Sequence, residues 1–162
     1  MALVLIQALS FSYPGPARPG FDGLSLSLDT RWRLGLAGAN GRGQSTLLRL
    51  LAGALAPTAG HIAMPCTAVL FPFCVPDGEM CAYEAAEHLF SAAEGWALAR
   101  EAGLLGVAEE ALGRPLATLS GGEATKVLLA MLFAGDERFL LLDEPTYTQA
   151  APARGAEPAH HA

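Results

Sequence analysis

The glycine-rich segment at residues 38–45, Gly-Ala-Asn-Gly-Arg-Gly-Gln-Ser, constrains the fold more than any other part of the chain. It follows a short apolar run at residues 33–37 and precedes leucines at helical spacing in residues 45–55. This order predicts a strand, a tight loop and a helix. Glycines let backbone N–H groups turn inward, and the helix presents the positive end of its dipole, so the loop is suited to a phosphate group.

One position of this segment departs from the phosphate-binding pattern Gly-x-x-x-x-Gly-Lys-Ser/Thr, because Gln44 replaces the lysine. Ser45 keeps the hydroxyl that the pattern places on a magnesium ion, but the ammonium group that would reach the β- and γ-phosphates is lost. Lys126 is the only lysine of the chain, and Arg42 would replace it only by bending back. A glycine-rich turn without a ligand stays open as the plainer interpretation.

Two further motifs follow along the chain. Residues 119–123, Leu-Ser-Gly-Gly-Glu, predict a helix start capped by Ser120 and Glu123, and the free N–H groups of such a start also suit a phosphate. Residues 139–146 predict a buried strand that ends in Asp143 and Glu144, two carboxylates suited to holding magnesium and orienting a water. Each motif alone has an ordinary structural explanation, but their order along one chain favours nucleotide chemistry.

The remaining pattern predicts an α/β fold. Residues 3–6 and 24–28 read as an antiparallel pair of strands, residues 81–112 as two or three short helices, and a further helix begins near residue 121. At 162 residues and 52% apolar composition the chain has the size of one domain with a sizeable core. We expect a cytoplasmic protein, because no apolar run would span a bilayer and the start lacks the basic residues of a signal peptide.

With these motifs in place, the sequence resembles the ATP-binding cassette (ABC) family over residues 1–146. Residues 38–45 look like its Walker A loop, 119–123 its LSGGE signature, 140–144 its Walker B segment and 11–13 its aromatic A-loop. The resemblance implies a P-loop NTPase fold with an N-terminal antiparallel β portion, a RecA-like parallel core and a helical subdomain at about residues 80–118. It also implies that the C-terminal part of the cassette is missing.

The resemblance also implies roles for individual residues. Tyr13 would stack on adenine, Ser45 and Asp143 would hold magnesium, and Glu144 would polarise the attacking water. The residues that would bind the phosphates, either in this chain or across to a facing cassette, are Gly38, Asn40, Gly41, Gly43, Gln44, Ser45, Thr46, Ser120, Gly121 and Gly122. ATP and Mg²⁺ are the expected ligands, and a second cassette is the expected partner that completes the site.

Within the family, residues 119–130 and the Phe-Pro-Phe at 71–73 look most like ABC-F proteins, especially the branch associated with ribosome protection against antibiotics. This likeness implies a ribosome as partner and a role in translation or antibiotic resistance. The ATP-binding subunit of an ABC transporter and a non-catalytic nucleotide-binding fragment are the alternatives.

The chain departs from the family pattern in several places, so we expect ATP hydrolysis to be weak or lost. Gln44 replaces the lysine, and Phe73 stands where many members have a glutamine. The Asn-His-Leu-Asp that usually follows is absent after Thr146, as are a switch histidine, the later strands and a second cassette.

The composition changes within one residue of Thr146 to the Ala- and Pro-rich segment 147–162. Such a composition offers little to a core, so we expect the segment to be disordered. Because GC-rich DNA read out of frame tends to encode these residue types, we expect a shifted reading frame or an assembly break just after Thr146.

Overall fold

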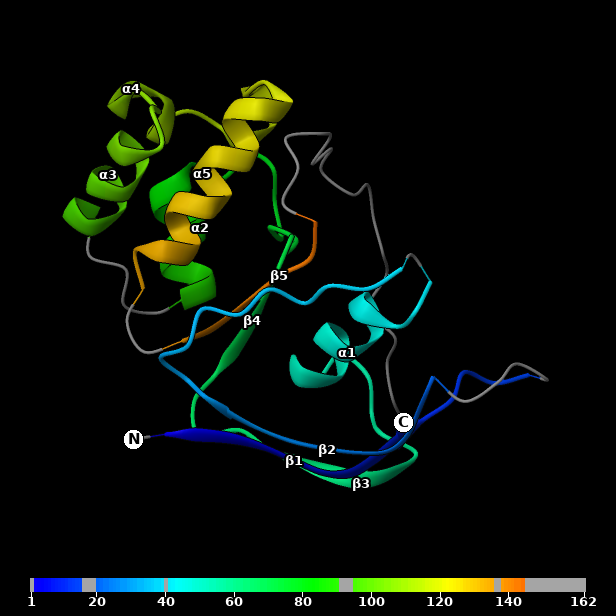
Figure 1. The fold of residues 1–162 in the computed structure, drawn as a ribbon. Helices are drawn as coiled ribbons and strands as arrows, with labels where there is room; N and C mark the ends of the chain where they lie inside the picture. Colours follow the sequence, from blue (N-terminus) through cyan, green and yellow to red (C-terminus); the bar gives the residue numbers. More distant parts are fainter. Residues whose placement is uncertain (1, 16–19, 40, 91–94, 136–137, 145–162) are drawn as a thin grey trace. The chain divides into compact units, whose positions relative to one another are not determined.

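The computed structural model describes residues 2–15, 20–39, 41–90, 95–135 and 138–144 (Figure 1). The chain divides into two compact units, the first formed by Met1–Phe71 with Glu137–Asp143 and the second by Pro72–Asp136 with Glu144–Ala162. The first unit contains β1 (Leu3–Phe11), β2 (Phe21–Asp29), α1 (Gln44–Leu51), β3 (Ala59–Ala63), β4 (Ala68–Phe71) and β5 (Phe139–Leu142). The second contains α2 (Ala82–Phe90), α3 (Gly95–Leu104), α4 (Glu109–Leu112), a 3₁₀ turn at Leu116–Thr118 and α5 (Gly121–Phe133).

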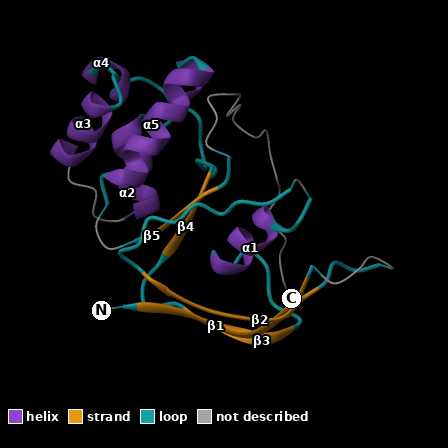
Figure 2. Cartoon of the chain, in the orientation of Figure 1, coloured by secondary structure: helices purple, strands orange, loops and turns teal. Residues whose placement is uncertain are grey.

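An antiparallel sheet with the order β2-β1-β3 opens the first unit (Figure 2). The sequence predicted its β1–β2 pair correctly, although both strands run further than residues 3–6 and 24–28. β3 was not predicted, because its sequence Ala-Gly-His-Ile-Ala carries one large apolar side chain and a glycine.

A bulge in β1 keeps its buried apolar side chains on one face of this sheet. The register with both neighbouring strands shifts after Ile6 and Gln7, and Ala8 has a φ of 47°. Because the extra residue resets the alternation, Val4 and Ile6 before the bulge and Leu9 and Phe11 after it are all buried. Gly60 lies opposite, where a Cβ would collide with the carbonyl oxygens of Gln7 and Ala8.

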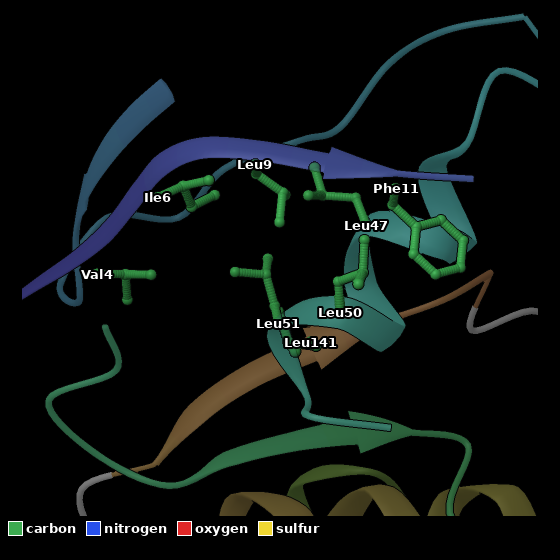
Figure 3. Packing of buried hydrophobic residues seen from close by; sticks show 8 residues of the cluster. All are labelled: Val4, Ile6, Leu9, Phe11, Leu47, Leu50, Leu51 and Leu141. Atoms are coloured by element: carbon green, nitrogen blue, oxygen red, sulfur yellow. The ribbon is translucent and has the colours of Figure 1, made fainter. Parts of the chain in front are cut away.

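The buried face of β1 packs on helix α1 and on β5. Figure 3 shows the side chains of β1 directed toward leucines on one face of α1, with Leu141 of β5 nearby. The core cluster consists of Val4, Ile6, Leu9, Phe11, Leu47, Leu50, Leu51 and Leu141. Burial of such side chains contributes roughly 1.5–3 kcal/mol each, so this cluster fixes α1 against the sheet.

β4 and β5 form a parallel pair in which Ala68 to Phe71 lie opposite Phe139 to Leu142. The apolar run at residues 139–142 predicted β5, whereas β4 was missed. Because parallel strands bring their carboxyl ends to the same edge, Phe71 and Leu142 end side by side. Asp143 follows at this edge, where its N–H donates to the Phe71 carbonyl at 3.0 Å.

The strand expected at residues 33–37 is wrong. This part of the chain forms no strand, and residues 31–39 are all exposed. Trp32, Leu34 and Leu36 are 58%, 60% and 51% exposed, so the apolar alternation that suggested a strand has no cover in the described structure. A strand depends on a hydrogen-bonded neighbour as well as on its own residues, and no described strand pairs with this segment.

The second unit is helical, as the sequence predicted for residues 81–112 and for the helix near residue 121. α5 packs against α3 and α2 (Figure 1). Its buried residues are Thr125 and the run from Val127 through Leu132. Alanines on α2 and α3, among them Ala82, Ala85 and Ala102, are fully buried and let the helices approach closely. No helix in the described ranges is long and apolar enough to cross a membrane.

Candidate functional site

The glycine-rich loop requires two residues in the left-handed region. Gly41 has a φ of 77° and Gly43 a φ of 93°, conformations that glycine adopts without steric cost. Gly43 is the N-cap of α1, and a Cβ there would lie 3.1 Å from the ring of Phe21. These φ values explain the glycines at positions 41 and 43. Asn40, also expected in the site, lies outside the described residues.

The start of α1 leaves its first backbone N–H groups without helical partners, as every helix start does. No side chain of the described residues caps it, because the N-cap is Gly43, and its first turn carries no acidic residue. The positive end of the helix dipole therefore faces the loop with no acidic residue in its own first turn to neutralise it. This is the electrostatic arrangement in which an anion such as phosphate binds.

Gln44 turns its side chain back across the loop. Its Nε2 donates to the Gly38 carbonyl at 3.1 Å, and a Cβ on Gly38 would lie 3.2 Å from that nitrogen. The first and seventh residues of the loop are thus tied by a neutral amide. The sequence showed that a charge is lost at position 44, but it gave no sign of this contact.

Ser45 and Asp143 meet at the carboxyl edge of the β4–β5 pair. The Ser45 hydroxyl donates to Asp143 Oδ1 at 3.0 Å, and both residues are half-buried. A hydroxyl and a carboxylate oxygen are hard ligands of the kind Mg²⁺ prefers, so these residues fit the ion that the motifs imply. No three His, Cys, Asp or Glu side chains gather as a metal site anywhere in the described ranges. A magnesium ion at Ser45 and Asp143 would therefore take its other ligands from water and phosphate.

Tyr13 lies beside the start of α1. Its hydroxyl shares a 3.2 Å hydrogen bond with the Thr46 hydroxyl, and the ring of Phe11 meets its ring edge to face with centroids 5.0 Å apart. Tyr13 is still 47% exposed, so part of its ring is open to a planar ligand. The structure thus brings together four predicted site residues of the first unit: Tyr13, Thr46, Ser45 and Asp143.

Glu144 follows Asp143 directly and has a φ of 43°. A non-glycine residue in the left-handed region is uncommon and costs of order 1–3 kcal/mol. Such conformations concentrate at functional sites, where the surrounding structure holds them in place. This backbone geometry is consistent with a functional role for Glu144, which the motif suggested and which stays a prediction.

The second unit holds the Leu-Ser-Gly-Gly-Glu motif at the start of α5. The capping box predicted there is confirmed, because Ser120 Oγ accepts from the Glu123 N–H at 3.3 Å and Glu123 Oε2 accepts from the Ser120 N–H at 3.0 Å. The hydroxyl of Ser120 also donates to Glu123 Oε2 at 2.6 Å. These hydrogen bonds from Ser120 lower the pKa of the Glu123 carboxyl below its usual value. Gly121 and Gly122 form the first turn, with open space where their Cβ atoms would be.

Comparison with known proteins places these motifs in one family. The sequence profile of ABC transporters matches residues 21–147. The chain is 33% identical to the Taurine import ATP-binding protein TauB of Pseudomonas putida, over 90% of this chain and 61% of that protein. It is 36% identical to the Nickel import ATP-binding protein NikO of Rhodobacter capsulatus, over 87% of this chain and 65% of that protein. The chain therefore spans just over three fifths of the length of these relatives.

A relative of a different kind is the ATP-binding cassette sub-family F member 3 of Homo sapiens, which is 33% identical over 83% of this chain and 20% of that protein. Among solved structures, an ABC transporter ATP-binding protein of Pyrococcus furiosus matches with a TM-score of 0.72 at 19% identity, covering 88% of this chain and 76% of that one. A bacterial Atm1-family ABC exporter with ATP bound matches with a TM-score of 0.68 at 23% identity, covering 89% and 29%. These two structural matches support the fold alone.

Proposed function

Since the chain belongs to the ABC transporter family and has its P-loop cassette fold, we propose that it is the nucleotide-binding part of an importer's ATP-binding subunit. The importer relatives align with most of this chain at 33–36% identity. In the proposed role the chain would act on the cytoplasmic side of a membrane, joined to a transmembrane protein. We do not infer from these relatives that this chain serves the transport of taurine or nickel.

This proposal changes the order of the hypotheses drawn from the sequence. The motifs favoured an ABC-F protein with a ribosome as partner and a role in antibiotic resistance, with a transporter subunit as the alternative. The importer relatives favour that alternative, and they lend no support to a ribosome or to antibiotic resistance. The ABC-F hypothesis stays as the second candidate, because the human sub-family F protein matches over 83% of this chain.

One observation carries the nucleotide-binding proposal, the hydrogen bond between Ser45 and Asp143 beside the uncapped start of α1. Residues of two separate motifs contact each other there, at the mouth of the loop that would hold phosphate. Gly38, Gly41 and Gly43 shape that loop, with Asn40 between them in sequence, and Thr46 links it to Tyr13. ATP and Mg²⁺ are the ligands we propose, with adenine against Tyr13.

The residues of this site predict slow ATP hydrolysis. Phosphoryl transfer is accelerated mainly by positioning and by stabilising charge on the transferred group. Gln44 offers a neutral amide where a lysine would offer a full charge, and its amide already donates to Gly38. Asp143 would orient the ion and Glu144 the water, but we propose that ATP hydrolysis is very slow or absent.

A complete site also requires a partner. By the family likeness, Ser120, Gly121 and Gly122 of one cassette would contact nucleotide on another. We therefore propose that the chain pairs with a second cassette, and we expect it to be a monomer without ATP. Gel filtration with and without Mg-ATP tests this, and a stable dimer without nucleotide would contradict it.

Isothermal titration calorimetry with Mg-ATP tests the nucleotide proposal. We expect weak but saturable binding that Ser45→Ala weakens further, while Ser45→Thr, which keeps a hydroxyl, retains it. Unchanged binding by Ser45→Ala would contradict the placement of the site.

Sedimentation separates the two candidate functions. With Mg-ATP present, an importer subunit should float with vesicles that contain an ABC importer's transmembrane protein and should not pellet with purified ribosomes. Pelleting with ribosomes alone would favour the ABC-F candidate.

A further inference from the structure

Gln44 is the residue of this loop that departs from the phosphate-binding pattern. Its Nε2 lies 3.1 Å from the Gly38 carbonyl oxygen and so directs one amide donor at the protein itself. In the lysine form of the pattern, backbone N–H groups hold the α- and β-phosphates and the lysine reaches the β- and γ-phosphates. The backbone N–H groups of this arrangement are present here. The side chain at the position that would reach furthest along the phosphate chain is a neutral amide, and it already donates to the Gly38 carbonyl.

The charged side chains near the loop also offer little to a third phosphate. Ser45 donates to the Asp143 carboxylate, so a negative side chain lies next to the residue that follows Gln44. A magnesium ion held by Ser45 and Asp143 would offset this carboxylate, but the added charge of a terminal phosphate would still lack the cation that a lysine places at position 44. Arg42 is the cationic side chain within the loop, and it is exposed to solvent, where its field is screened.

We infer that this site binds a nucleoside diphosphate at least as tightly as a nucleoside triphosphate. The inference rests on the proposed function, since it concerns the same loop. The helix start and the glycine N–H groups suffice for two phosphates, and the third phosphate finds no matching cation at position 44. The chain would then remain occupied by diphosphate under conditions in which a lysine-containing cassette exchanges it for triphosphate.

The test compares Mg-ADP and Mg-ATP by calorimetry on the full chain and on three variants. Wild type should bind Mg-ATP no more tightly than Mg-ADP. Gln44→Lys should tighten Mg-ATP by about tenfold to a hundredfold and Mg-ADP by less, because a charge-assisted contact to the outer phosphates is restored. Gln44→Ala, which removes the tie to Gly38 without adding charge, should keep the wild-type order of affinities.

Arg42→Ala is the control for the remaining cation of the loop, and it should leave the ratio of the two affinities unchanged. Tighter binding of Mg-ATP than of Mg-ADP by wild type would overturn the inference while leaving the proposed function intact. A selective loss of Mg-ATP binding in Arg42→Ala would also overturn it, because Arg42 would then supply the missing charge. If neither nucleotide binds to wild type or to Gln44→Lys, while thermal unfolding shows folded protein, both the proposed function and the inference fail.

Discussion

The hydroxyl of Ser45 donates a 3.0 Å hydrogen bond to the carboxylate of Asp143, a residue 98 positions later in the chain. Ser45 lies in the first turn of α1, and Asp143 follows the last residue of β5. The contact therefore links the helix after the glycine loop with the parallel strand pair. It brings the two predicted magnesium ligands to one point of the first unit.

A double-mutant cycle measures the strength of this link. Ser45→Ala and Asp143→Ala should each change the free energy of unfolding, and the double variant should show a coupling of about 1.5–3 kcal/mol, the usual net value of a hydrogen bond to a charged group. The measurement is urea unfolding in the absence of metal and nucleotide. Strictly additive effects would show that the two side chains do not interact in solution.

The signature motif has a structural role that is separable from any role toward nucleotide. Ser120→Ala removes the N-cap of α5 and should destabilise the second unit by about 1 kcal/mol, as loss of such caps commonly does. Ser120→Thr keeps a hydroxyl at the cap and should lose much less. Thermal unfolding followed by circular dichroism compares the two, and equal losses would argue against the cap. The same Ala variant should raise the pKa of Glu123, because the hydroxyl of Ser120 no longer holds the charged form.

Acid should weaken the turn that follows β2. Asp29 Oδ1 accepts from the Arg31 N–H at 3.0 Å and Oδ2 accepts from its guanidinium at 3.0 Å, so Arg31 lowers the pKa of Asp29 to about 2. A depressed pKa in the folded state adds stability above the unfolded value of about 3.9, and this stability is lost as pH falls toward 2. Asp29→Asn should remove this part of the pH dependence, measured as the unfolding midpoint between pH 5 and pH 2. Asp22→Asn, at an exposed site of the same strand, should retain it.

Exposed apolar residues between β2 and the glycine loop should promote self-association. Leu34 and Leu36 are 60% and 51% exposed, in a segment that no described strand covers. Replacing both with Gln should lower light scattering at high protein concentration without lowering the melting temperature. Leu141→Gln, at a position that is 4% exposed, should instead destabilise the fold. Unchanged scattering in the double variant would show that this segment does not drive association.

Much of the fold could be predicted because the local signals were strong. The apolar run before Asp143 and the helical spacing after Ser45 each specify an element by themselves, and both elements formed. The Ser120–Glu123 cap also formed, because its hydrogen bonds are local. The strand at residues 33–37 was wrongly predicted, because pairing with a neighbour decides whether an apolar alternation becomes a strand.

The contacts of the candidate site were less accessible to sequence reasoning. The motifs indicated that Ser45 and Asp143 act together, but the bonds of Gln44 to Gly38 and of Tyr13 to Thr46 depend on side-chain directions that no pattern encodes. The tail at residues 147–162 and Asn40 lie outside the described residues, so the expectations for them stay predictions. The sequence showed that Gln44 lacks the charge of a lysine. Only the structure shows that its amide donates to the Gly38 carbonyl.

The dependence of nucleotide binding on magnesium shows whether Ser45 and Asp143 form a site for a magnesium-bound nucleotide. Mg-ATP is titrated into the full chain and into Asp143→Asn by calorimetry, first with excess magnesium and then with EDTA. We expect that chelation weakens binding by wild type about tenfold or more, and that Asp143→Asn binds weakly in both conditions because its metal ligand is gone. Wild-type binding that is equally tight with magnesium and with EDTA, or an Asp143→Asn variant that responds to magnesium as wild type does, would contradict it.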